Sequence, residues 1–493
     1  MPPGFFGDIP HATTKPFKPA QGPTLVGVRE KCGVVGVSLP GKGAAPYLYM
    51  GLRALQHRGQ ESAGMATASQ SQMYHRRGMG LVHEVFDGEL LDTLRGSVGI
   101  GHVRYSTTGT SNLENAQPLI VGTGTREIAL AHNGDIVNFQ RLRRRLALSG
   151  VEFLGNADTE ALGQYIAMEF SRTRDMETAI RRAMMEASGA YAVVLLHGNH
   201  LYAFRDPHGI RPLCLGSLDG GYAVASESVA LELMGGKLER ELLPGEIVSI
   251  ERGQVSHSST IPRPGSTAYC MFEWVYFSRP DSIFQGQLIY EVRHRIGKAL
   301  ARESPLEADV VVPVPDSSRP QALGFSEESG IPYAEGLIKS RFVERTFILP
   351  DQRRREEEVR VKLHPIPGVL RDKRVVLLDD SIVRGTTLRE IVHMVRAAGA
   401  REVHVRVGCP PIVAPCYYGV DMKERKDLVA FEKTQEEVAR ALRADSVRYL
   451  TIPGLVQSIG VGQNGLCLGC LTARYPVDVP QEQRRFQRTL REF

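Results

Sequence analysis

The first half of the chain alternates between short apolar segments and helical periods. Residues 33–39 (GVVGVSL) form an apolar run typical of a strand, and the segment DTEALGQYIAMEF begins two consecutive helical periods. Two further apolar runs, residues 191–196 and 201–205, flank an HGN turn and predict an antiparallel hairpin. Hairpins beside paired helices indicate a layered α+β domain, which we expect over residues 32–261.

The pattern changes in the second half. Residues 261–270 (IPRPGSTAYC) contain proline and glycine and predict a connection between two domains. The run ADVVVPVPDSS then predicts a strand that ends in polar residues. The segment KRVVLLDDSIVRGTTLREIVHMVRAAGAREVHVRVG predicts strand, loop, helix and strand in turn. Such a βαβ unit indicates an α/β domain with a mainly parallel sheet, which we expect over residues 270–476.

Length and composition narrow the class of protein. A chain of 493 residues favours two large domains or three smaller ones, and 42% apolar with 23% charged residues is typical of a globular protein. A net charge of +5 is small for this length and argues against a dedicated nucleic-acid binder. No window is apolar enough for a membrane span, and residues 1–31 lack the apolar centre of a secretory signal. We therefore expect a cytoplasmic protein with a leader at residues 1–31 and a basic tail at residues 477–493.

A polar loop after the apolar strand at residues 374–378 has the features of a phosphate site. The strand ends in Asp379 and Asp380, and the loop SIVRGTT leads into a helix with one apolar face. Free backbone N–H groups and the helix dipole favour an anion there, and Gly385 permits close approach. The loop also supplies the hydroxyl donors Ser381, Thr386 and Thr387. Because the two carboxylates would repel a phosphate, we expect them to hold sugar hydroxyls or Mg²⁺.

The stretch VVLLDDSIVRGTT resembles the phosphoribosyl pyrophosphate (PRPP) motif of the type I phosphoribosyltransferases. The resemblance implies that Asp379 and Asp380 hold the ribose hydroxyls and, with Ser317 of VPVPDSSRP, Mg²⁺. It also implies that the 5-phosphate lies against the loop residues Ser381, Arg384, Gly385, Thr386 and Thr387.

Residues 338–365 form a long charged segment without a core pattern. One interpretation is a solvated surface loop. The other is a lid that closes over pyrophosphate and excludes water. As a lid, it would bind PRPP through Lys339 and Arg341, with Arg345 and Lys362 as further basic groups.

Cys32, in VREKCGVVGV, is either a small core residue or a nucleophile that a leader covers. Other stretches of this half are hard to explain by packing alone: RALQHRGQESAG with Arg58, and GHVRYSTTG with Arg104. In addition, AHNGDI predicts a strand followed by an Asn-Gly turn, and ADTEAL predicts a helix capped by Asp158 or Thr159. Taken one at a time, each stretch is also explained as a turn, a cap or surface charge.

Together and in this order, the stretches resemble the glutaminase domain of the class II glutamine amidotransferases, which are N-terminal-nucleophile enzymes. With the PRPP motif downstream, the chain resembles the glutamine PRPP amidotransferase family from about residue 32 to residue 476. The resemblance implies a four-layer αββα glutaminase domain followed by a type I phosphoribosyltransferase domain. It implies that Cys32 is the nucleophile and that Asn133 and Gly134 form the oxyanion hole. The implied glutamine-binding residues are Arg104, Asp158, Arg58 and Tyr105.

In this family the leader is removed, which implies autocatalytic processing that makes Cys32 the first residue. A free α-amine titrates near about 7.7–8 and can act as general base beside the thiol, whereas an amide N–H cannot accept the proton. Ammonia from glutamine would pass through a shielded apolar passage, since ammonium has no lone pair. It would then displace pyrophosphate from PRPP, which is the first committed step of purine synthesis.

The cysteine content favours metal binding over disulfides in a reducing compartment. The pair in CLGC has ligand spacing, and the residues alone leave a tetrathiolate zinc site or unconnected core thiols open. Cys409 could compete as a ligand, and we expect Cys214 in the core. The family resemblance implies a [4Fe–4S] cluster held by Cys270, Cys416, Cys467 and Cys470.

Two other functions stay open from the sequence. An amidotransferase with another acceptor, as in glucosamine-6-phosphate synthase or asparagine synthetase, is disfavoured by the PRPP motif. A regulator that binds PRPP without turnover is disfavoured by the intact Cys32, Asn133, Gly134 and Asp158. The resemblance also implies inhibition by AMP- or GMP-type nucleotides and a homo-oligomer, with a tetramer expected. We expect neither a nucleic acid nor a membrane as partner.

Overall fold

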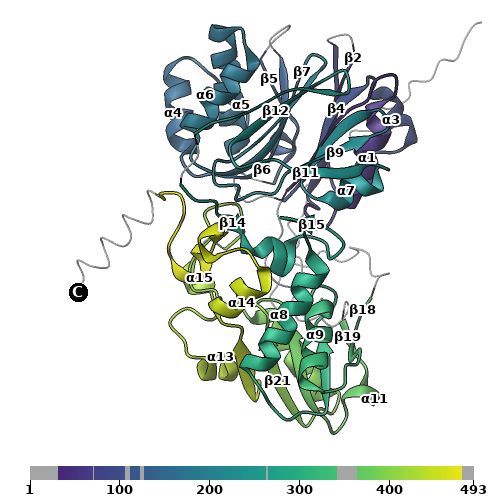
Figure 1. The fold of residues 1–493 in the computed structure, drawn as a ribbon, viewed down its shortest axis with the longest axis vertical. Coiled ribbons are helices and arrows are strands. Elements are labelled where there is room, and N and C mark those ends of the chain that lie inside the picture. Colours follow the sequence, from purple (N-terminus) through teal and green to yellow (C-terminus); the bar gives the residue numbers. More distant parts are fainter. Residues whose placement is uncertain are drawn as a thin grey trace, which may run out of the picture.

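The computed structural model has two halves stacked along the long axis of the molecule (Figure 1). It describes residues 32–69, 72–105, 111–122, 127–262, 265–340, 363–422 and 424–479. The predicted leader, most of the predicted lid with Arg341, and the end of the tail therefore lie outside the described residues. Among the residues that are described, no helix is both long and apolar enough to cross a membrane.

Two antiparallel sheets form the centre of the first half. One has the strand order β11-β9-β10-β1-β4-β2-β3. Its strands are β1 (Gly33–Ser38), β2 (Ser62–Ser69), β3 (Gln72–Met79), β4 (Val98–Arg104), β9 (Cys214–Leu218), β10 (Gly221–Ala225) and β11 (Lys237–Glu241). The other sheet has the order β13-β12-β8-β7-β6-β5. Its strands are β5 (Leu119–Val121), β6 (Ile128–Ile136), β7 (Gly189–His197), β8 (His200–Arg205), β12 (Glu246–Glu251) and β13 (Gln254–Thr260). Strands β7 and β8 pair antiparallel, which confirms the predicted hairpin.

Helices cover the outer face of each sheet, so this half has the predicted αββα order of layers, seen from left to right in Figure 1. Leu48 and Leu52 of α1 pack on Val35 and Val37 of the first sheet. A separate apolar cluster lies between helices α4, α5 and α6 and the second sheet, and a third, rich in alanine and valine, fills the space between the sheets. The helices are α1 (Ala44–Ala54), α2 (Val82–Val85), α3 (Gly88–Thr93), α4 (Phe139–Leu148), α5 (Asp158–Thr173), α6 (Met176–Glu186) and α7 (Ser228–Leu233).

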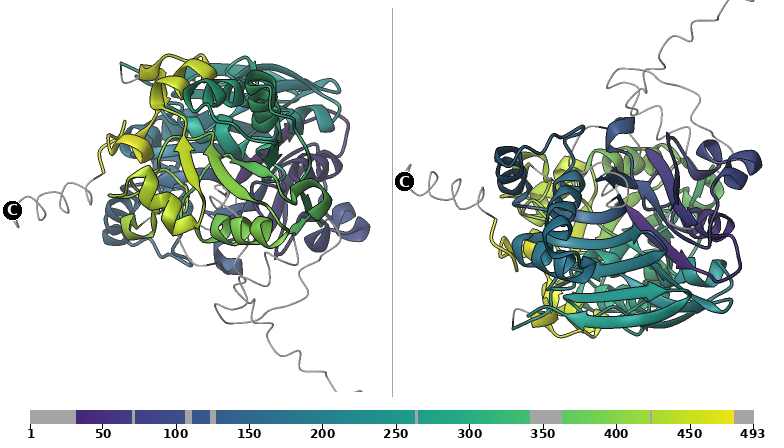
Figure 2. Two further views of the ribbon diagram at one scale, coloured as in Figure 1. Left: turned by 90° about the horizontal axis from the view of Figure 1, so that it is seen from below. Right: turned by 90° about the horizontal axis from the view of Figure 1, so that it is seen from above.

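A parallel sheet forms the centre of the second half, as predicted, and helices lie on both of its faces (Figure 2). Its strands, in spatial order, are β17 (Val310–Pro313), β20 (Arg374–Asp379), β21 (Glu402–Val407) and β22 (Ser446–Tyr449). Pro313 pairs with Leu378, so the polar residues that follow β17 and β20 meet at the same edge. The helices are α8 (Ile289–Glu303), α9 (Arg319–Ser329), α11 (Pro367–Leu370), α12 (Thr386–Ala397), α13 (Gln435–Leu442), α14 (Ile452–Ile459) and α15 (Gly469–Thr472).

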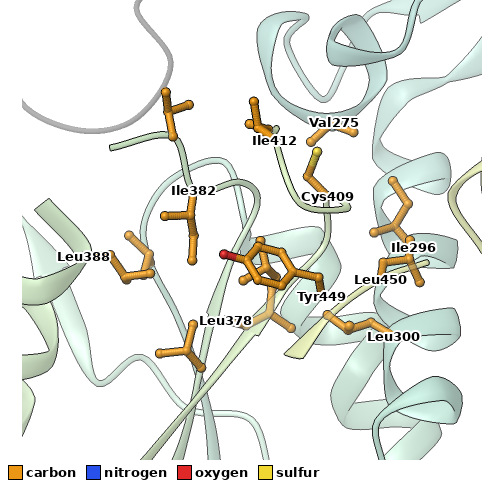
Figure 3. Packing of buried hydrophobic residues seen from close by; sticks show 14 of the residues in the cluster. Val275, Ile296, Leu300, Leu378, Ile382, Leu388, Cys409, Ile412, Tyr449 and Leu450 are labelled. Atoms are coloured by element: carbon orange, nitrogen blue, oxygen red, sulfur yellow. The ribbon is translucent and has the colours of Figure 1, made fainter. Parts of the chain in front are cut away.

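The apolar face predicted for α12 is buried against this sheet. Figure 3 shows Leu388 of α12 near Ile382 and Leu378 on one side of Tyr449, with Ile296 and Leu300 of α8 on the other. Full burial of an aliphatic side chain of this size contributes about 1.5–3 kcal/mol to stability. The predicted set on α12 is buried throughout: Leu388, Ile391, Val392 and Val395.

Short elements connect the two halves. Strand β14 (Tyr269–Cys270) pairs in parallel with β23 (Leu466–Cys467), and the π-helical turn η3 (Glu273–Phe277) follows β14. Figure 1 places β14 and β15 (Ile283–Phe284) between the halves. Three further short strands are β16 (Gln287–Leu288), which pairs with β15, and β18 (Leu337–Lys339) with β19 (Leu363–Pro365), which pair at the two ends of the predicted lid.

One local prediction is wrong. Asn133 and Gly134 do not form a turn after a strand, because both lie within β6, where Gly134 pairs with Tyr191. Gly134 has a φ of 146°, and a Cβ there would lie only 1.9 Å from the carbonyl oxygen of Ala190. Glycine therefore lets this strand continue where any other residue would clash.

A second local prediction is also wrong. Helix α5 begins at Asp158, as expected, but its N-cap is Ala157 and no side chain caps it. The Asp158 carboxylate accepts a hydrogen bond from the backbone N–H of Ile136 instead, at 2.9 Å. The side chain therefore connects α5 with β6, and its other oxygen accepts from the N–H of Thr159 in the first turn.

Candidate active sites

Cys32 lies immediately before β1 and is partly buried. Its Sγ donates to the carbonyl oxygen of Tyr105 at 3.4 Å, and its own carbonyl accepts from Arg58 Nε at 3.3 Å. Burial raises the pKa of the thiol to about 11. At neutral pH the thiol is therefore protonated and needs a base before it can act as a nucleophile.

Arg104 and Asp158 lie close to this thiol. Burial raises the pKa of the Asp158 carboxyl, and the charge of Arg104 at the end of β4 opposes that rise. Arg104 also opposes the rise in the pKa of Cys32, which places one guanidinium near both groups. The Asp158 carboxylate accepts hydrogen bonds from the N–H groups of Ile136 and Thr159, each at 2.9 Å. A cation and an anion side by side match the α-carboxylate and α-ammonium of an amino acid.

Asn133 has a side-chain amide that nothing in the described part of the chain satisfies. The residue is fully buried, and neither Nδ2 nor Oδ1 has a hydrogen-bond partner there. An unsatisfied buried amide costs about 1–3 kcal/mol, so such a group calls for a functional explanation. On β6, Asn133 and Gly134 lie between His132, which contacts His102 of β4, and Ile136, which contacts Asp158. The amide is therefore on the strand that borders the Cys32 site.

Two buried histidines support this strand without adding charge. His102 Nε2 lies 3.2 Å from the carbonyl oxygen of His132, and His132 Nδ1 lies 3.2 Å from Thr159 Oγ1. Burial lowers the pKa of His102 to about 3 and that of His132 to about 4. Both rings are therefore neutral at neutral pH, and they act as hydrogen-bonding supports.

Arg58 is 1% exposed and lies behind the nucleophile. Besides the Cys32 carbonyl, it contacts two buried carboxylates, Glu227 at 2.5 Å and Glu273 at 2.9 Å. Its role in binding glutamine stays a prediction, because the contacts of its guanidinium are with these groups of the protein.

A second site lies at the edge of the parallel sheet. Ser317, after β17, donates to Asp380 Oδ2 at 2.5 Å, and Ser381 donates to Asp380 Oδ1 at 2.6 Å. Asp379 ends β20, and its Oδ1 accepts from the Asp380 N–H at 3.0 Å. Burial, reinforced by the neighbouring Asp380, raises the pKa of Asp379 well above its ordinary value. Two adjacent buried carboxylates next to hydroxyls can hold a divalent cation or sugar hydroxyls.

The start of α12 faces this edge. Gly385 is its N-cap with a φ of 75°, and no side chain caps the first turn, which begins with Thr386 and Thr387. Arg384 is half-exposed, with its Nε 3.8 Å from Asp427. These features suit an anion at the helix N-terminus.

Asp316, which follows β17, forms ion pairs with two basic side chains. Lys339 Nζ of β18 lies 3.0 Å from Asp316 Oδ2, and Arg319 contacts Oδ1 at 2.5 Å. The structure thus brings Lys339 to the same edge as Ser317 and Asp380. Arg341 lies outside the described residues.

The cysteines predicted as cluster ligands gather at the junction of the halves. Cys270 and Cys467 face each other in the β14–β23 pair, and Ala414 N–H donates to the Cys470 carbonyl at 3.0 Å, two residues before Cys416. Burial raises the pKa of Cys467, and Cys270 and Cys416 add to the rise. No disulfide joins the seven cysteines, all of which are described. Among the described residues, no group of three or more His, Cys, Asp or Glu is arranged to hold a metal ion, so the cluster stays a prediction.

Of the other two cysteines, Cys409 lies near the predicted ligands Cys270 and Cys470, and Cys214 lies in the other half. Burial raises the pKa of Cys409 well above its ordinary value, and Asp380 and Cys270 add to the rise. The Cys409 thiol therefore lies near both the Asp380 carboxylate and Cys270. Cys214 is buried in the α1 core and donates to the Ala225 carbonyl at 3.2 Å, as expected for a core residue.

Comparison with known proteins relates both sites to one family. Residues 102–233 match the family model described as "Glutamine amidotransferase domain". The chain is 48% identical to an amidophosphoribosyltransferase of Methanocaldococcus jannaschii, over 92% of this chain and 99% of that one. It is also 48% identical to the amidophosphoribosyltransferase of Archaeoglobus fulgidus, with the same shares covered. The chain belongs to the amidophosphoribosyltransferase family.

Solved structures agree with that family. A glutamine PRPP amidotransferase from B. subtilis, in complex with ADP and GMP, is 41% identical, with a TM-score of 0.86 over 92% of this chain and 98% of that one. This member of the amidophosphoribosyltransferase family is thus an enzyme that joins an N-terminal-nucleophile glutaminase fold to a phosphoribosyltransferase fold, as the sequence predicted.

Two buried carboxylates of this chain, Glu227 and Glu273, were not predicted from the sequence. Both contact Arg58, and Glu273 is also 3.7 Å from Arg211. A signal existed in the stretch CMFEWVYF, because a single glutamate in an otherwise apolar run indicates a buried charge with a partner.

Proposed function

We propose that this protein transfers ammonia from glutamine to PRPP and yields 5-phosphoribosylamine, glutamate and pyrophosphate. The observation that supports this best is the presence of both sites in one chain. One has a thiol near Arg104 and Asp158, with an unsatisfied amide on the strand that contacts Asp158, and the other has a carboxylate pair beside an open helix N-terminus. We place the boundary between the glutaminase and transferase domains at residues 261–270.

The direct test is to incubate the purified protein with glutamine, PRPP and Mg²⁺. Glutamate and pyrophosphate should appear together in equal amounts. Glutamate without pyrophosphate would indicate another acceptor, and neither product would indicate a binding protein without turnover.

In the glutaminase site, Cys32 would attack the carboxamide carbon of glutamine. The C–S bond forms as the C–N bond breaks, and the nitrogen leaves as ammonia with the proton taken from the thiol. Water then cleaves the γ-glutamyl thioester and releases glutamate. Arg104 would pair with the α-carboxylate of glutamine and Asp158 with its α-ammonium, while Tyr105 and Arg58 fix the position of Cys32.

Replacing Asn133 by alanine tests the oxyanion hole. We expect kcat for glutamate release to fall about 10²–10³-fold, because the amide would donate to the oxygen that becomes charged in the transition state. KM for glutamine should change little, since that charge is absent from the bound substrate. Steady-state kinetics measure both values.

Asn115→Ala is the matched control, because Asn115 is also buried but donates to Asn156 at 2.8 Å instead of facing the site. It should keep kcat within a few-fold. Equal losses in the two variants would contradict the assignment of Asn133.

The pH dependence identifies the base. If the α-amine of a processed Cys32 takes the thiol proton, glutamine turnover should rise with pH through about 7.7–8 and then level off. A thiol that ionised on its own would make the rate rise toward the raised pKa of Cys32, about 11. Measuring kcat/KM across neutral and alkaline pH distinguishes the two.

A chain that still carries residues before Cys32, checked by mass spectrometry, should be inactive with glutamine, and full activity in such a chain would contradict the proposal.

At the transfer site, the ammonia nitrogen would bond to C1 of PRPP as the C1–O bond to pyrophosphate breaks, and the nitrogen would then give one proton to the released pyrophosphate or to water. Asp379, Asp380 and Ser317 would hold Mg²⁺, which supplies positive charge to the departing pyrophosphate when bound. The start of α12, residues 384–387, would hold the 5-phosphate, and Lys339 and Arg341 of the lid would approach the pyrophosphate end.

For the cysteines at the junction we propose a structural [4Fe–4S] cluster with the ligands Cys270, Cys416, Cys467 and Cys470. Four thiolates are the usual ligand set of such a cluster. The purified protein should be brown and contain about four iron atoms per chain. Cys467→Ser should lose both colour and iron, whereas Cys214→Ser should keep them. Stoichiometric zinc without iron would contradict the proposal.

The remaining parts of the proposal follow the family. We propose a cytoplasmic location, a homo-oligomer, and inhibition by purine nucleotides, since the B. subtilis relative is complexed with ADP and GMP. We also propose that ammonia passes directly between the two sites.

A further inference from the structure

One carboxylate of the second half holds two arginines of the first. Glu273 begins η3 and is fully buried. Its two oxygens accept from the Arg58 guanidinium at 2.9 and 3.0 Å, and Oε1 lies 3.7 Å from Arg211 Nη1. Arg58 and Arg211 are buried as well. Removing one partner of such a buried ion group leaves an uncompensated charge, which is strongly unfavourable. The contacts between Glu273 and the two arginines are therefore expected to persist.

Each arginine contacts a different part of the glutaminase site. Arg58 Nε donates to the carbonyl of Cys32 at 3.3 Å. A Cβ built at Gly419 would lie 3.1 Å from Arg211 Nη2 and 3.1 Å from the carbonyl oxygen of Gly134, so the Arg211 guanidinium and the Gly134 peptide both pack against Gly419. None of the three guanidinium nitrogens of Arg211 has a hydrogen-bond partner among the described residues, which leaves the charge of Glu273 to orient it.

The turn that carries Glu273 is itself fixed to the transfer site. Ser278 Oγ donates to Glu273 Oε2 at 2.9 Å, and Arg293 donates to the carbonyls of Ser278 and Trp274 at 2.7 and 2.8 Å. The charge of Arg293 opposes the rise in the pKa of Asp380 that burial causes, which places Arg293 close to that carboxylate. Glu273 is thus held by the second half and reaches into the first.

We propose that Glu273 is a positioning residue for the glutamine half-reaction, which acts on the Cys32 carbonyl through Arg58 and on the Gly134 peptide through Arg211. The inference rests on the proposed function. The nucleophile precedes β1 and the oxyanion-hole residues lie on β6, in different sheets, and Glu273 fixes their relative position. A displacement of about 1 Å between reacting groups can lower a rate about 10²-fold.

The test is Glu273→Gln, which keeps the shape of the side chain and removes its charge. We expect kcat for glutamate release from glutamine to fall about 10²-fold, with a smaller change in KM. Pyrophosphate release with added ammonia in place of glutamine should stay within about 2-fold of the unsubstituted protein, because neither arginine lies at the transfer site. The ammonia reaction also reports that the variant is folded.

Glu169→Gln is the matched control. Glu169 is 4% exposed and contacts two arginines, Arg172 at 3.0 Å and Arg182 at 2.8 Å, in the helical layer away from both sites. Its loss should leave the ratio of glutamine-dependent to ammonia-dependent rates unchanged. Equal losses of both activities in Glu273→Gln, or no loss, would overturn the inference.

Arg211→Met gives a second measurement that does not depend on the folding of Glu273→Gln. It should cause the same selective loss with glutamine, and the double variant should lose less than the product of the two single effects, because both act through one contact. Independent effects, or an Arg211→Met protein with the unsubstituted ratio of rates, would overturn the inference. An unsubstituted protein that uses neither glutamine nor ammonia would overturn the proposed function and this inference together.

Discussion

Replacing Cys32 by alanine is expected to reduce glutamine-dependent formation of phosphoribosylamine by at least about 10⁴-fold, the size of effect seen when a nucleophile is removed. Of the described side chains near Cys32, those of His102, His132 and Asp158 are not ready nucleophiles. His102 and His132 are neutral and buried, and the Asp158 carboxylate is held by two backbone N–H groups. Ammonia-dependent synthesis should continue at close to the original rate, because Asp379 and Asp380 are in the other half of the chain.

Cys214→Ala serves as the control for this experiment. Cys214 lies in the same half, is fully buried and donates to the carbonyl of Ala225, so it is a thiol without access to substrate. That variant should keep both activities, with some loss of stability from the small cavity. Loss of ammonia-dependent synthesis in Cys32→Ala would show that the two sites do not work separately.

Local sequence patterns were sufficient for most of the fold. The β7–β8 hairpin and the β20–α12 unit form within about twenty to thirty consecutive residues, so periodicity and turn residues determine them. The position of Asp379 and Asp380 followed from the same unit, because polar residues after a parallel strand must lie at its carboxyl edge. The roles of Asn133 and Gly134 came from the family resemblance alone.

What the sequence did not predict depends on partners far away in the chain. The local sequence around Asn133 and Gly134 predicts a turn. Strand β6 continues there because it pairs with β7, whose residues come more than fifty positions later in the chain. The contacts of Arg58 with Glu227 and Glu273 join residues separated by 169 and 215 positions. Periodicity carries no information about which distant charge each of these residues pairs with.

The two carboxylates at the transfer site are expected to have opposite effects on ligand binding and on the stability of the fold. Asp379 and Asp380 are adjacent, buried carboxylates, and burial together with Asp380 raises the pKa of Asp379 well above its ordinary value. An acid whose pKa is raised on folding destabilises the protein at pH values above its ordinary pKa. This arrangement is therefore unfavourable on its own, and a cation or sugar bound there, as proposed, would offset it.

Replacing Asp379 by asparagine should accordingly change activity and stability in opposite directions. With glutamine or ammonia, kcat/KM for PRPP should fall about 10²–10³-fold, because the proposed site for Mg²⁺ and ribose would lose one charged group. The melting temperature without ligand should rise at neutral pH, since the repulsion with Asp380 disappears, and the rise should shrink as the pH falls and Asp379 of the unsubstituted protein becomes protonated. Calorimetry between neutral and acidic pH measures this change in melting temperature.

Asp309→Asn should show the reverse pattern. Asp309 lies just before β17, away from the site, and its hydrogen bonds from Arg374 lower its pKa to about 2. An acid whose pKa falls on folding stabilises the protein above its ordinary pKa, so this variant should melt earlier at neutral pH and keep full activity. Asp309→Asn should lose stability but not activity. If Asp379→Asn instead loses both stability and activity, the carboxylate pair stabilises the sheet and is not a ligand site.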